Sequence, residues 1–373
     1  MRILVLEDEL SPRGGQELSL VSVCEALSRR GHEIILLYKS GGSLEARYRA
    51  FCSRLIRAGA YSIDHRNFSG SVAGFFGALA RSCAARPGLI YANQYQDSLL
   101  AGCVSFFCGA PFVCHLRIPS PKRFCNQHRL GLSMVNRLIV ISKNMRSDWE
   151  RHASLRGRLE LVYNGIDAGI YPFSDDPRPA RRRLGIPEGA TVIMYAGRVH
   201  PLKGVDMLAD TFMELKMRIP NLFLVVVGRE FDIRDFISDL KALLEKRGFA
   251  DSALWIPHTD DMPGLYAASD LAVLPSRWPE PFGRTLIESM ACGTPSIGSD
   301  AGGIPEVLTG EFRKFVFPAG DTRALTALVE RAIGWRQSDP ELGRRARAHV
   351  ERNFSLEKTV DGVEAVFRKA GGR

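Results

Sequence analysis

Short apolar runs alternate with amphipathic stretches along most of the 373 residues. The stretches between the runs repeat apolar residues at helical spacing. Short apolar strands separated by helices predict parallel sheets that are covered on both faces. A helix is predicted over Gln16–Arg30, where Gly31 supplies a stop signal. In the first half of the chain, strands are expected at Ile3–Leu6, Ile34–Tyr38, Leu89–Ala92, Phe112–His115, Leu138–Ile141 and Leu159–Tyr163.

The alternation is interrupted at Tyr171–Ala190. This stretch holds four prolines and mixed charge without periodicity, which is typical of a linker. The chain is also longer than one hydrophobic core usually supports. We therefore predict an α/β protein of two doubly wound, Rossmann-like domains, residues 1–172 and 173–354, that face each other across a cleft. The strands expected after the linker are Val192–Ala196, Phe223–Val227, Ala253–Ile256, Leu271–Leu274 and Ser296–Ser299.

Composition narrows the class of protein. Apolar residues make up 45% and charged residues 24%, which is ordinary for a soluble globular protein. No apolar run reaches the ~18 residues of a membrane-spanning helix, and the opening MRILVLEDEL does not resemble a secretory signal. The eight cysteines show no CxxC pair and no metal-ligand spacing with histidine. We expect a cytoplasmic protein whose cysteines are reduced and that has no metal site.

The net charge of +9 lies in the first half, because residues 1–170 hold 22 lysines and arginines against 13 acidic residues. Several arginines there are interleaved with Phe51, Leu55, Ile56 and Phe68. Such a surface suits peripheral contact with the anionic inner face of the cell membrane. It also suits the binding of an anionic acceptor. An ordinary solvated face fits equally well. No nucleic acid is expected, because neither zinc-finger spacing nor an RNA-binding signature accompanies the charge. The clustered arginines are Arg47, Arg49, Arg54, Arg57 and Arg66.

The strongest chemical signal follows the strand Leu271–Leu274. Two glutamates, Glu280 and Glu288, stand eight positions apart there. Pro279 and Pro281 hold Glu280 in a loop, and a helix is expected to begin near Gly283. Glu280 can then face a sugar, while Glu288, one turn into the helix, can accept hydrogen bonds from a ribose diol.

The start of that helix is itself a candidate anion site. The backbone N–H groups of Gly283, Arg284 and Thr285 and the helix dipole behind them suit a phosphate. Gly283 lets the phosphate approach closely. A plain capped helix with two surface glutamates fits the same spacing.

Two further elements follow strands. Arg198 and Lys203, five positions apart after Val192–Ala196, can clamp a diphosphate and stabilise it as it leaves. A solvated basic loop fits the same residues. A glycine turn at residues 12–17, with Gly15 opening a helix, could contact a ligand through backbone N–H groups, although it lacks the GxGxxG pattern. His115 ends its strand, where it either faces the cleft or is structural.

Together these elements resemble the retaining glycosyltransferases of family 4, which have the GT-B fold. The resemblance spans nearly the whole chain. It rests on Gly14–Gly15, His115, NGID at Asn164–Asp167, GRVHPLKG at Gly197–Gly204 and EPFGRTLIE at Glu280–Glu288. The segment Ala291–Glu306 matches as well.

The resemblance implies that a hexose-type sugar moves from a UDP- or GDP-sugar donor to a glycan or lipid-linked acceptor. It implies retained anomeric configuration, no cofactor and no metal. The second domain would bind the donor and the first the acceptor, with a final helix in residues 355–373 returning to the first domain. Glu280 and His115 would contact the transferred sugar. The donor would be bound by Gly15, Arg198, Lys203, Phe282, Gly283, Arg284, Thr285, Leu286 and Glu288.

Two features depart from the family pattern, and both lie in the first domain. His115 is followed by Leu116 and Arg117, where the family usually has an acid, and the glycine turn reads GGQE. The basic first half favours a membrane-linked intermediate of cell-surface polysaccharide as acceptor. Other hypotheses are a nucleotide-sugar epimerase or phosphorylase on the same fold, or a non-catalytic module that binds membranes or polyanions.

Overall fold

The computed structural model describes residues 1–373 except 13, 231–232, 258 and 373. The chain divides into two compact units. The first unit comprises Met1–Gly165 and Leu356–Arg373, and the second comprises Ile166–Ser355. The sequence pattern predicts residues 166–172 in the first domain. The structure bonds this segment to the second unit, where Arg347 donates to the carbonyl oxygen of Tyr171 at 2.8 Å.

The described residues of the first unit form a seven-stranded parallel sheet in the order β3-β2-β1-β4-β5-β6-β7. Its central strands are almost fully buried, as expected where helices cover both faces of a sheet. The strands are β1 (Arg2–Glu9), β2 (Glu33–Ser40), β3 (Arg54–Arg57), β4 (Leu89–Ala92), β5 (Phe112–Leu116), β6 (Arg137–Val140) and β7 (Leu159–Leu161).

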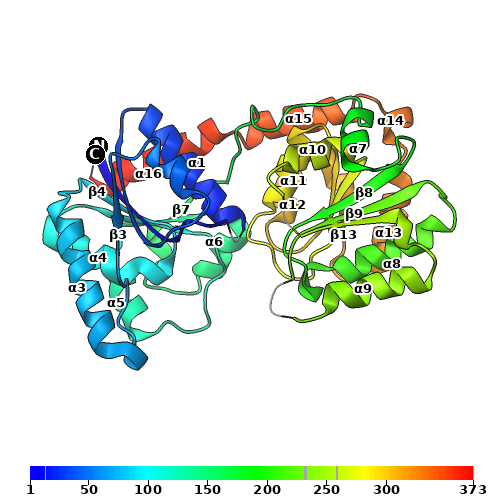
Figure 1. Cartoon of the computed structure of the whole chain (residues 1–373). Helices are drawn as coiled ribbons and strands as arrows, with labels where there is room; N and C mark the ends of the chain where they lie inside the picture. The colour runs from blue at the N-terminus through cyan, green and yellow to red at the C-terminus, as the bar shows by residue number, and fades with distance from the viewer. Residues whose placement is uncertain (13, 231–232, 258, 373) are drawn as a thin grey trace. The chain divides into compact units, whose positions relative to one another are not determined.

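Two layers of helices cover this sheet, with α1 and the C-terminal helix α16 on one face and α3, α4 and α5 on the other (Figure 1). Val360, Val363 and Phe367 of α16 belong to the same hydrophobic core as α1 and β1. The C-terminal helix therefore completes the first unit. The helices are α1 (Gly15–Arg29), α2 (Glu45–Arg49), α3 (Phe68–Ala84), α4 (Ser98–Cys108), α5 (Asn126–Ser133), α6 (Lys143–Trp149) and α16 (Leu356–Ala370).

The described residues of the second unit form a six-stranded parallel sheet in the order β10-β9-β8-β11-β12-β13. The strands are β8 (Thr191–Ala196), β9 (Leu222–Val227), β10 (Ala253–Ile256), β11 (Leu271–Leu274), β12 (Ser296–Ser299) and β13 (Val316–Phe317). The helices are α7 (Arg178–Leu184), α8 (Val205–Lys216), α9 (Phe236–Lys246), α10 (Met262–Ala268), α11 (Arg284–Ala291), α12 (Ile304–Val307), α13 (Thr322–Ala332), α14 (Trp335–Ser338) and α15 (Leu342–Asn353).

The prediction of two Rossmann-like parallel α/β domains is confirmed, and every expected strand is present. The sequence analysis missed β3 and β13. It took residues 54–57 for a basic surface, but Ile56 of β3 is buried against the sheet. Within the described residues, no helix combines the length and the apolar character needed to cross a bilayer.

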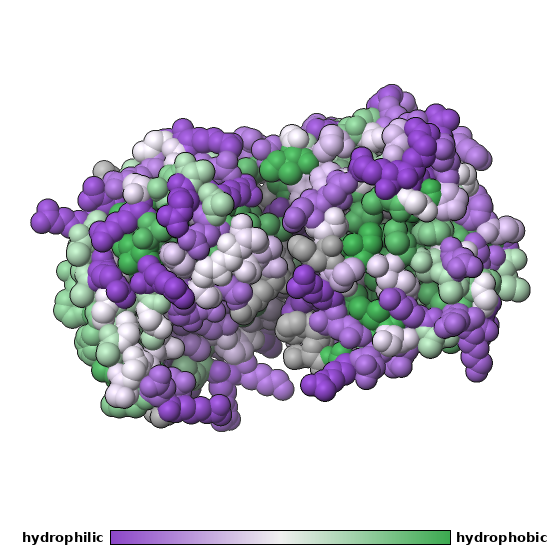
Figure 2. Space-filling model, in the orientation of Figure 1, coloured by the Kyte–Doolittle hydropathy of each residue, from purple (hydrophilic) through white to green (hydrophobic). Residues whose placement is uncertain are grey.

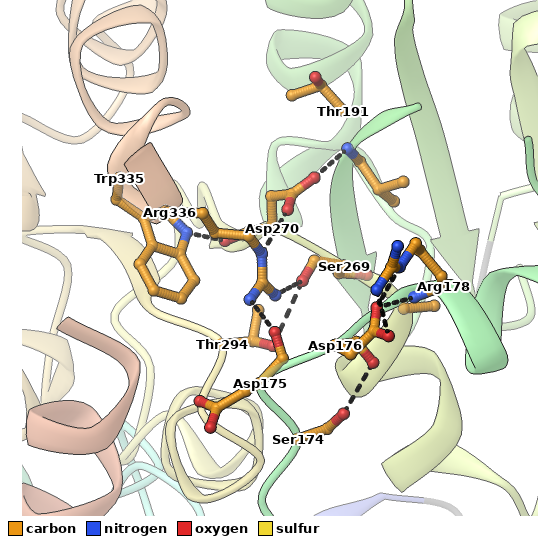
Figure 3. Close-up of polar contacts among 12 residues, drawn as sticks. Ser174, Asp175, Asp176, Arg178, Thr191, Ser269, Asp270, Thr294, Trp335 and Arg336 are labelled. Carbon is orange, nitrogen blue, oxygen red and sulfur yellow. Dashed lines mark hydrogen bonds and ion pairs between the residues drawn. The ribbon is translucent and has the colours of Figure 1, made fainter. Parts of the chain in front are cut away.

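The proline-rich stretch predicted as a linker contains α7, which a buried ion network attaches to the second unit. Figure 3 shows the part of this network formed by Asp270, Trp335 and Arg336. Asp270, just before β11, accepts hydrogen bonds from Arg181 of α7 at 2.7 Å and from Arg336 of α14 at 2.8 Å. Oδ2 of Asp270, which accepts the hydrogen bond from Arg181, also accepts one from the backbone N–H of Val192 at 2.7 Å. The indole of Trp335 donates to the Asp270 carbonyl oxygen at 2.7 Å. One carboxylate thus joins two helices to the amino-terminal edge of the sheet.

Candidate functional site

Lys203 and Glu280 meet at the carboxyl edge of the second unit's sheet. Lys203 ends the 3-10 turn η4 (Pro201–Lys203) after β8, and Glu280 lies in the loop after β11. Lys203 Nζ lies 2.5 Å from Glu280 Oε1, and both side chains are largely buried. The ammonium assigned to the diphosphate and the carboxylate assigned to the sugar therefore form one ion pair.

The loops that carry this pair are bonded to each other. The backbone N–H groups of Arg277 and Trp278 donate to the carbonyl oxygen of Leu202 at 2.8 and 3.1 Å. The Arg277 guanidinium also donates twice to the carboxylate of Asp206 in α8, at 2.7 and 2.9 Å. Groups held in place before a ligand arrives lose less entropy on binding it.

A glycine pair fixes Glu280 from the other side. Gly302 forms a bridge with Glu280, and Gly303 donates its N–H to the Glu280 carbonyl oxygen at 2.7 Å. Gly302 has a φ of +67°, and a Cβ there would lie 2.3 Å from that carbonyl oxygen. The Gly302–Gly303 turn is therefore needed for the position of the Glu280 backbone.

The helix α11 begins beside this pair. Gly283 precedes it with a φ of +102°, and a Cβ there would lie 3.1 Å from the Leu286 side chain. The first N–H groups of a helix have no intrahelical acceptor, and no side chain caps this end among the described residues. Phe282 and Leu286 are buried in the core, so they offer a ligand their backbone only. The backbone of residues 283–285 retains the geometry of an anion site.

Glu288 is held by three donors inside the second unit. Its Oε1 accepts hydrogen bonds from Tyr171 at 2.9 Å and from Arg284 at 2.6 Å, and its Oε2 accepts one from Tyr266 at 3.0 Å. Burial, and next the Glu288 charge, raises the pKa of both tyrosines, so they stay protonated donors. An ionised carboxylate can accept about four hydrogen bonds, so Glu288 has room for one further donor.

Arg198 lies at the exposed start of the same loop as Lys203. Its carbonyl oxygen accepts a hydrogen bond from the buried hydroxyl of Tyr195 at 2.6 Å. Burial raises the pKa of Tyr195, and the nearby Glu280 charge raises it further. The backbone of Arg198 is thus anchored while its side chain is open to solvent.

In the first unit, His115 is fully buried at the end of β5. Its Nδ1 lies 2.6 Å from the Tyr91 hydroxyl and 3.3 Å from an Arg117 guanidinium nitrogen. Burial, and then the Arg117 charge, lowers the pKa of His115 well below its ordinary value, so the ring is neutral. Because Arg117 can only donate, Nδ1 accepts and the proton lies on Nε2. Nε2 is buried and has no hydrogen-bond partner among the residues that the structure describes.

Arg117, the residue that departs from the family pattern, organises this edge of the sheet. It donates to Asn93 at 2.6 Å and to Asn164 at 2.9 Å as well as facing His115. Asn93 in turn donates to Glu7 at the end of β1 at 2.7 Å. Arg117 therefore links the glycosyltransferase-like NGID segment to the buried histidine.

Gly15 is the first residue of α1, and the preceding Gly14 donates its N–H to Glu17 at 3.1 Å. Among the described residues other than its chain neighbours, none has an atom within 4 Å of a Cβ built on Gly14. Arg13 of the same turn lies outside the described residues. Gly15 and His115 thus belong to the first unit, and the other predicted site residues belong to the second.

Asp97, which the sequence analysis did not single out, is a buried acid near Glu7. Its Oδ2 has no hydrogen-bond partner in the structure, and burial raises its pKa from 3.8 to about 7. A raised folded-state pKa contributes stability at low pH, and this contribution is lost as the pH rises from about 3.8 to about 7. The neighbouring Glu7 also has a raised pKa, caused first by burial and then by the Asp97 charge.

We expect Asp97→Asn to flatten the pH dependence of stability. Between about pH 5 and pH 8, the wild-type free energy of unfolding should fall by about 2–3 kcal/mol more than that of the variant, because only the wild type must bury an ionised Asp97. Urea unfolding at several pH values measures this difference. Parallel pH profiles for the two proteins would contradict it.

Several of these contacts could not have been found in the sequence. Tyr171 lies in the proline-rich stretch, Tyr266 in α10 and Tyr91 in β4, and none belongs to a motif. Asn93 follows a strand, which was the available signal, but asparagine is common in turns. Asn164 lies in the NGID segment, whose pattern does not indicate its contact with Arg117. Among the described residues, no group of three His, Cys, Asp or Glu side chains is arranged to hold a metal ion.

Comparison with known proteins matches both units. A family model described as glycosyl transferases group 1 matches residues 177–349, and one described as glycosyltransferase family 4 matches residues 13–169. The chain is 31% identical over 268 residues to a D-inositol 3-phosphate glycosyltransferase of Salinispora arenicola (strain CNS-205), covering 68% of this chain and 59% of that protein.

A second relative is the lipopolysaccharide core biosynthesis mannosyltransferase LpsB of Rhizobium meliloti (strain 1021), 31% identical over 213 residues, or 56% of this chain and 60% of that protein. The chain thus matches about three fifths of the length of these relatives. The crystal structure of Anabaena Alr3699/HepE in complex with UDP-glucose superimposes with a TM-score of 0.81 at 23% identity, covering 98% of each chain. That structural likeness shows a shared fold.

Proposed function

The chain belongs to the family 4, group 1 glycosyl transferases, and from this premise we propose that it moves a hexose-type sugar from a nucleotide-sugar donor to a glycan or lipid-linked acceptor. The observation that carries the proposal is the buried Lys203–Glu280 pair beside the start of α11. A cation, a carboxylate and a helix N-terminus at one sheet edge provide partners for a phosphate and for sugar hydroxyls. The HepE structures contain UDP and UDP-glucose, which supports a nucleotide-sugar donor here.

We assign the donor to the second unit. The diphosphate would contact Lys203, Arg198 and the backbone of residues 283–285. The ribose would take the one acceptor position left on Glu288. Glu280, whose position is fixed by Lys203 and Gly303, would accept hydrogen bonds from the transferred sugar.

His115 would act as a neutral hydrogen-bond donor to a sugar hydroxyl. This role follows from its protonation, since Arg117 and Tyr91 occupy Nδ1 and the proton lies on the unpartnered Nε2. A buried donor without a partner costs about 1–3 kcal/mol, which a ligand hydroxyl would recover. His115 would not serve as a general base, because its Nε2 is already protonated.

In the proposed reaction, the acceptor hydroxyl attacks the anomeric carbon on the face from which the diphosphate leaves. The bond between that carbon and the phosphate oxygen breaks, and its electron pair goes to the phosphate. The leaving phosphate takes the acceptor's proton. Because the attack comes from the face that the diphosphate leaves, the anomeric configuration is retained. Lys203 and Arg198 would stabilise the added negative charge, so we propose a reaction that needs no metal ion.

The proposal predicts that nucleoside diphosphate is released from a UDP- or GDP-sugar only when an acceptor is present, at a rate that a chelator leaves unchanged. Chromatography of the nucleotide and mass spectrometry of the acceptor measure the two products. Conversion of the donor alone into an isomeric nucleotide-sugar would instead identify an epimerase. Loss of turnover with chelator, restored by a divalent metal, would refute metal independence.

A further inference from the structure

Two surface helices of the first unit are almost without charge. Among the 17 residues of α3 the one charged side chain is Arg81, and the 11 residues of α4 contain none. A helix that lies between a core and water normally carries charged residues on its outer side. The outer side of α3 and the exposed last turn of α4 lack that polar face, while most of α4 is buried.

Large apolar side chains occupy the outer surface instead. The inner side of α3 buries Phe75 and Ala78, while Phe68, Val72, Phe76 and Leu79 form a second stripe at helical spacing. The last turn of α4 exposes two adjacent phenylalanines, whose ring centroids are 5.4 Å apart. The side chains of Phe68, Phe76, Phe106 and Phe107 are 61%, 59%, 75% and 66% exposed. In Figure 2, hydrophobic and near-neutral residues gather over these helices.

The same region is positively charged. Residues 65–147 contain a single acidic residue, Asp97, and it is buried. The thiols of Cys83 in α3 and Cys108 in α4 are adjacent, so the last turns of the two helices lie together. Burial, and next this contact, raises the pKa of Cys83 to about 11. This proximity sets Phe106 and Phe107 near Arg81 and its neighbour Arg86. The exposed lysines and arginines of residues 81–133 are Arg81, Arg86, Lys122, Arg123 and Arg129.

Two of the arginines that the sequence grouped into a basic surface, Arg47 and Arg49, behave differently. Arg47 pairs with Glu25 of α1 at 2.7 Å, and Arg49 pairs with Glu45 at 2.6 Å. Ile56, which was expected to lie among them on that surface, is buried in β3. The contribution of α2 to an anion-binding surface is therefore largely cancelled by acids.

We propose that the outer face of α3, α4 and α5 docks on an anionic lipid bilayer. We call it the Phe/Arg face and define it by Phe68, Phe76, Phe106, Phe107, Leu130 and the five cations named above. The phenylalanines enter the boundary between headgroups and acyl chains, and the cations meet lipid phosphates. A membrane fits better than a second copy of the chain, because two such faces would bring like charges together, and residues 65–147 supply no exposed acid to pair them.

Co-sedimentation with lipid vesicles tests the proposal. The wild-type protein should sediment with vesicles that contain phosphatidylglycerol and much less with phosphatidylcholine alone, and added salt should release it. The double variant Phe106→Ser/Phe107→Ser and the double variant Arg81→Glu/Arg86→Glu should each lower the partition coefficient by about 10-fold or more. Met217→Ser and Arg313→Glu, at exposed positions of the second unit, are matched controls and should bind as the wild type does.

The test separates docking from misfolding and from catalysis. The variants should keep the wild-type unfolding midpoint and their turnover of a water-soluble acceptor, because the face lies outside the donor and sugar contacts. Equal binding of wild type and both double variants would overturn the proposal. Self-association of the wild type that the phenylalanine variant abolishes, without any vesicle binding, would assign the face to a second copy and overturn it too.

Discussion

Replacing Lys203 with alanine is expected to lower kcat/KM for the nucleotide-sugar by about 10²–10³-fold. The substitution removes the buried cation proposed to stabilise the leaving diphosphate. It also leaves Glu280 unpaired, with its side chain only 9% exposed. Steady-state kinetics at sub-saturating donor measures the loss.

The structure calls for two companion variants, because Lys203 has two roles. Lys203→Arg keeps the charge and should recover part of the activity, whereas Glu280→Gln frees the ammonium and should impair sugar transfer more than binding of the nucleoside diphosphate. Lys314→Ala, at an exposed position in the same unit, is the matched control. If Lys203→Ala turned over donor like the wild type, the diphosphate assignment would be wrong.

Most of the fold could be predicted from the sequence, because strands buried on both faces read as continuous apolar runs. The two missed strands show where that signal fails. Residues 54–57 of β3 read Arg-Leu-Ile-Arg at an edge of the sheet, and β13 has only two residues. In β3 the arginines at both ends leave an apolar run of only two residues. β13 is too short to form an apolar run that can be detected.

The donor part of the candidate site was equally visible, because its residues follow strands and lie within short segments. Lys203 and Glu280 are 77 positions apart, yet β8 and β11 are neighbours in the sheet, so their carboxyl ends meet. The residues that orient the site were not visible. Tyr171 and Tyr266 reach Glu288 from segments without a motif, and a partner chosen by tertiary packing leaves no local pattern.

The charge pattern shows the same limit. Arg47 and Arg49 stand out in the sequence because they are close together, but their acids, Glu25 and Glu45, come from α1 and from one turn earlier in α2. Arginines that are clustered along the sequence are thus poor guides to surface charge, unless the acidic residues that pair with them in the fold are also known.

The largest loss of stability is expected from Asp270→Ala. This carboxylate is 5% exposed and compensates the guanidinium groups of Arg181 and Arg336. Removing one partner of a buried ion pair leaves an uncompensated charge, which costs about 3–5 kcal/mol. Urea unfolding should therefore show a lower free energy of unfolding by about that amount.

Two further variants identify the cause of this loss. Asp176→Ala removes an exposed pair with Arg178 and should leave the free energy of unfolding nearly unchanged. Adding Arg181→Met to Asp270→Ala should recover part of the stability, because the stranded charge is then gone while the apolar contacts remain. If the double variant were no more stable than Asp270→Ala alone, the loss would come from the Val192 and Trp335 hydrogen bonds at the sheet edge, and the ion pair would contribute little.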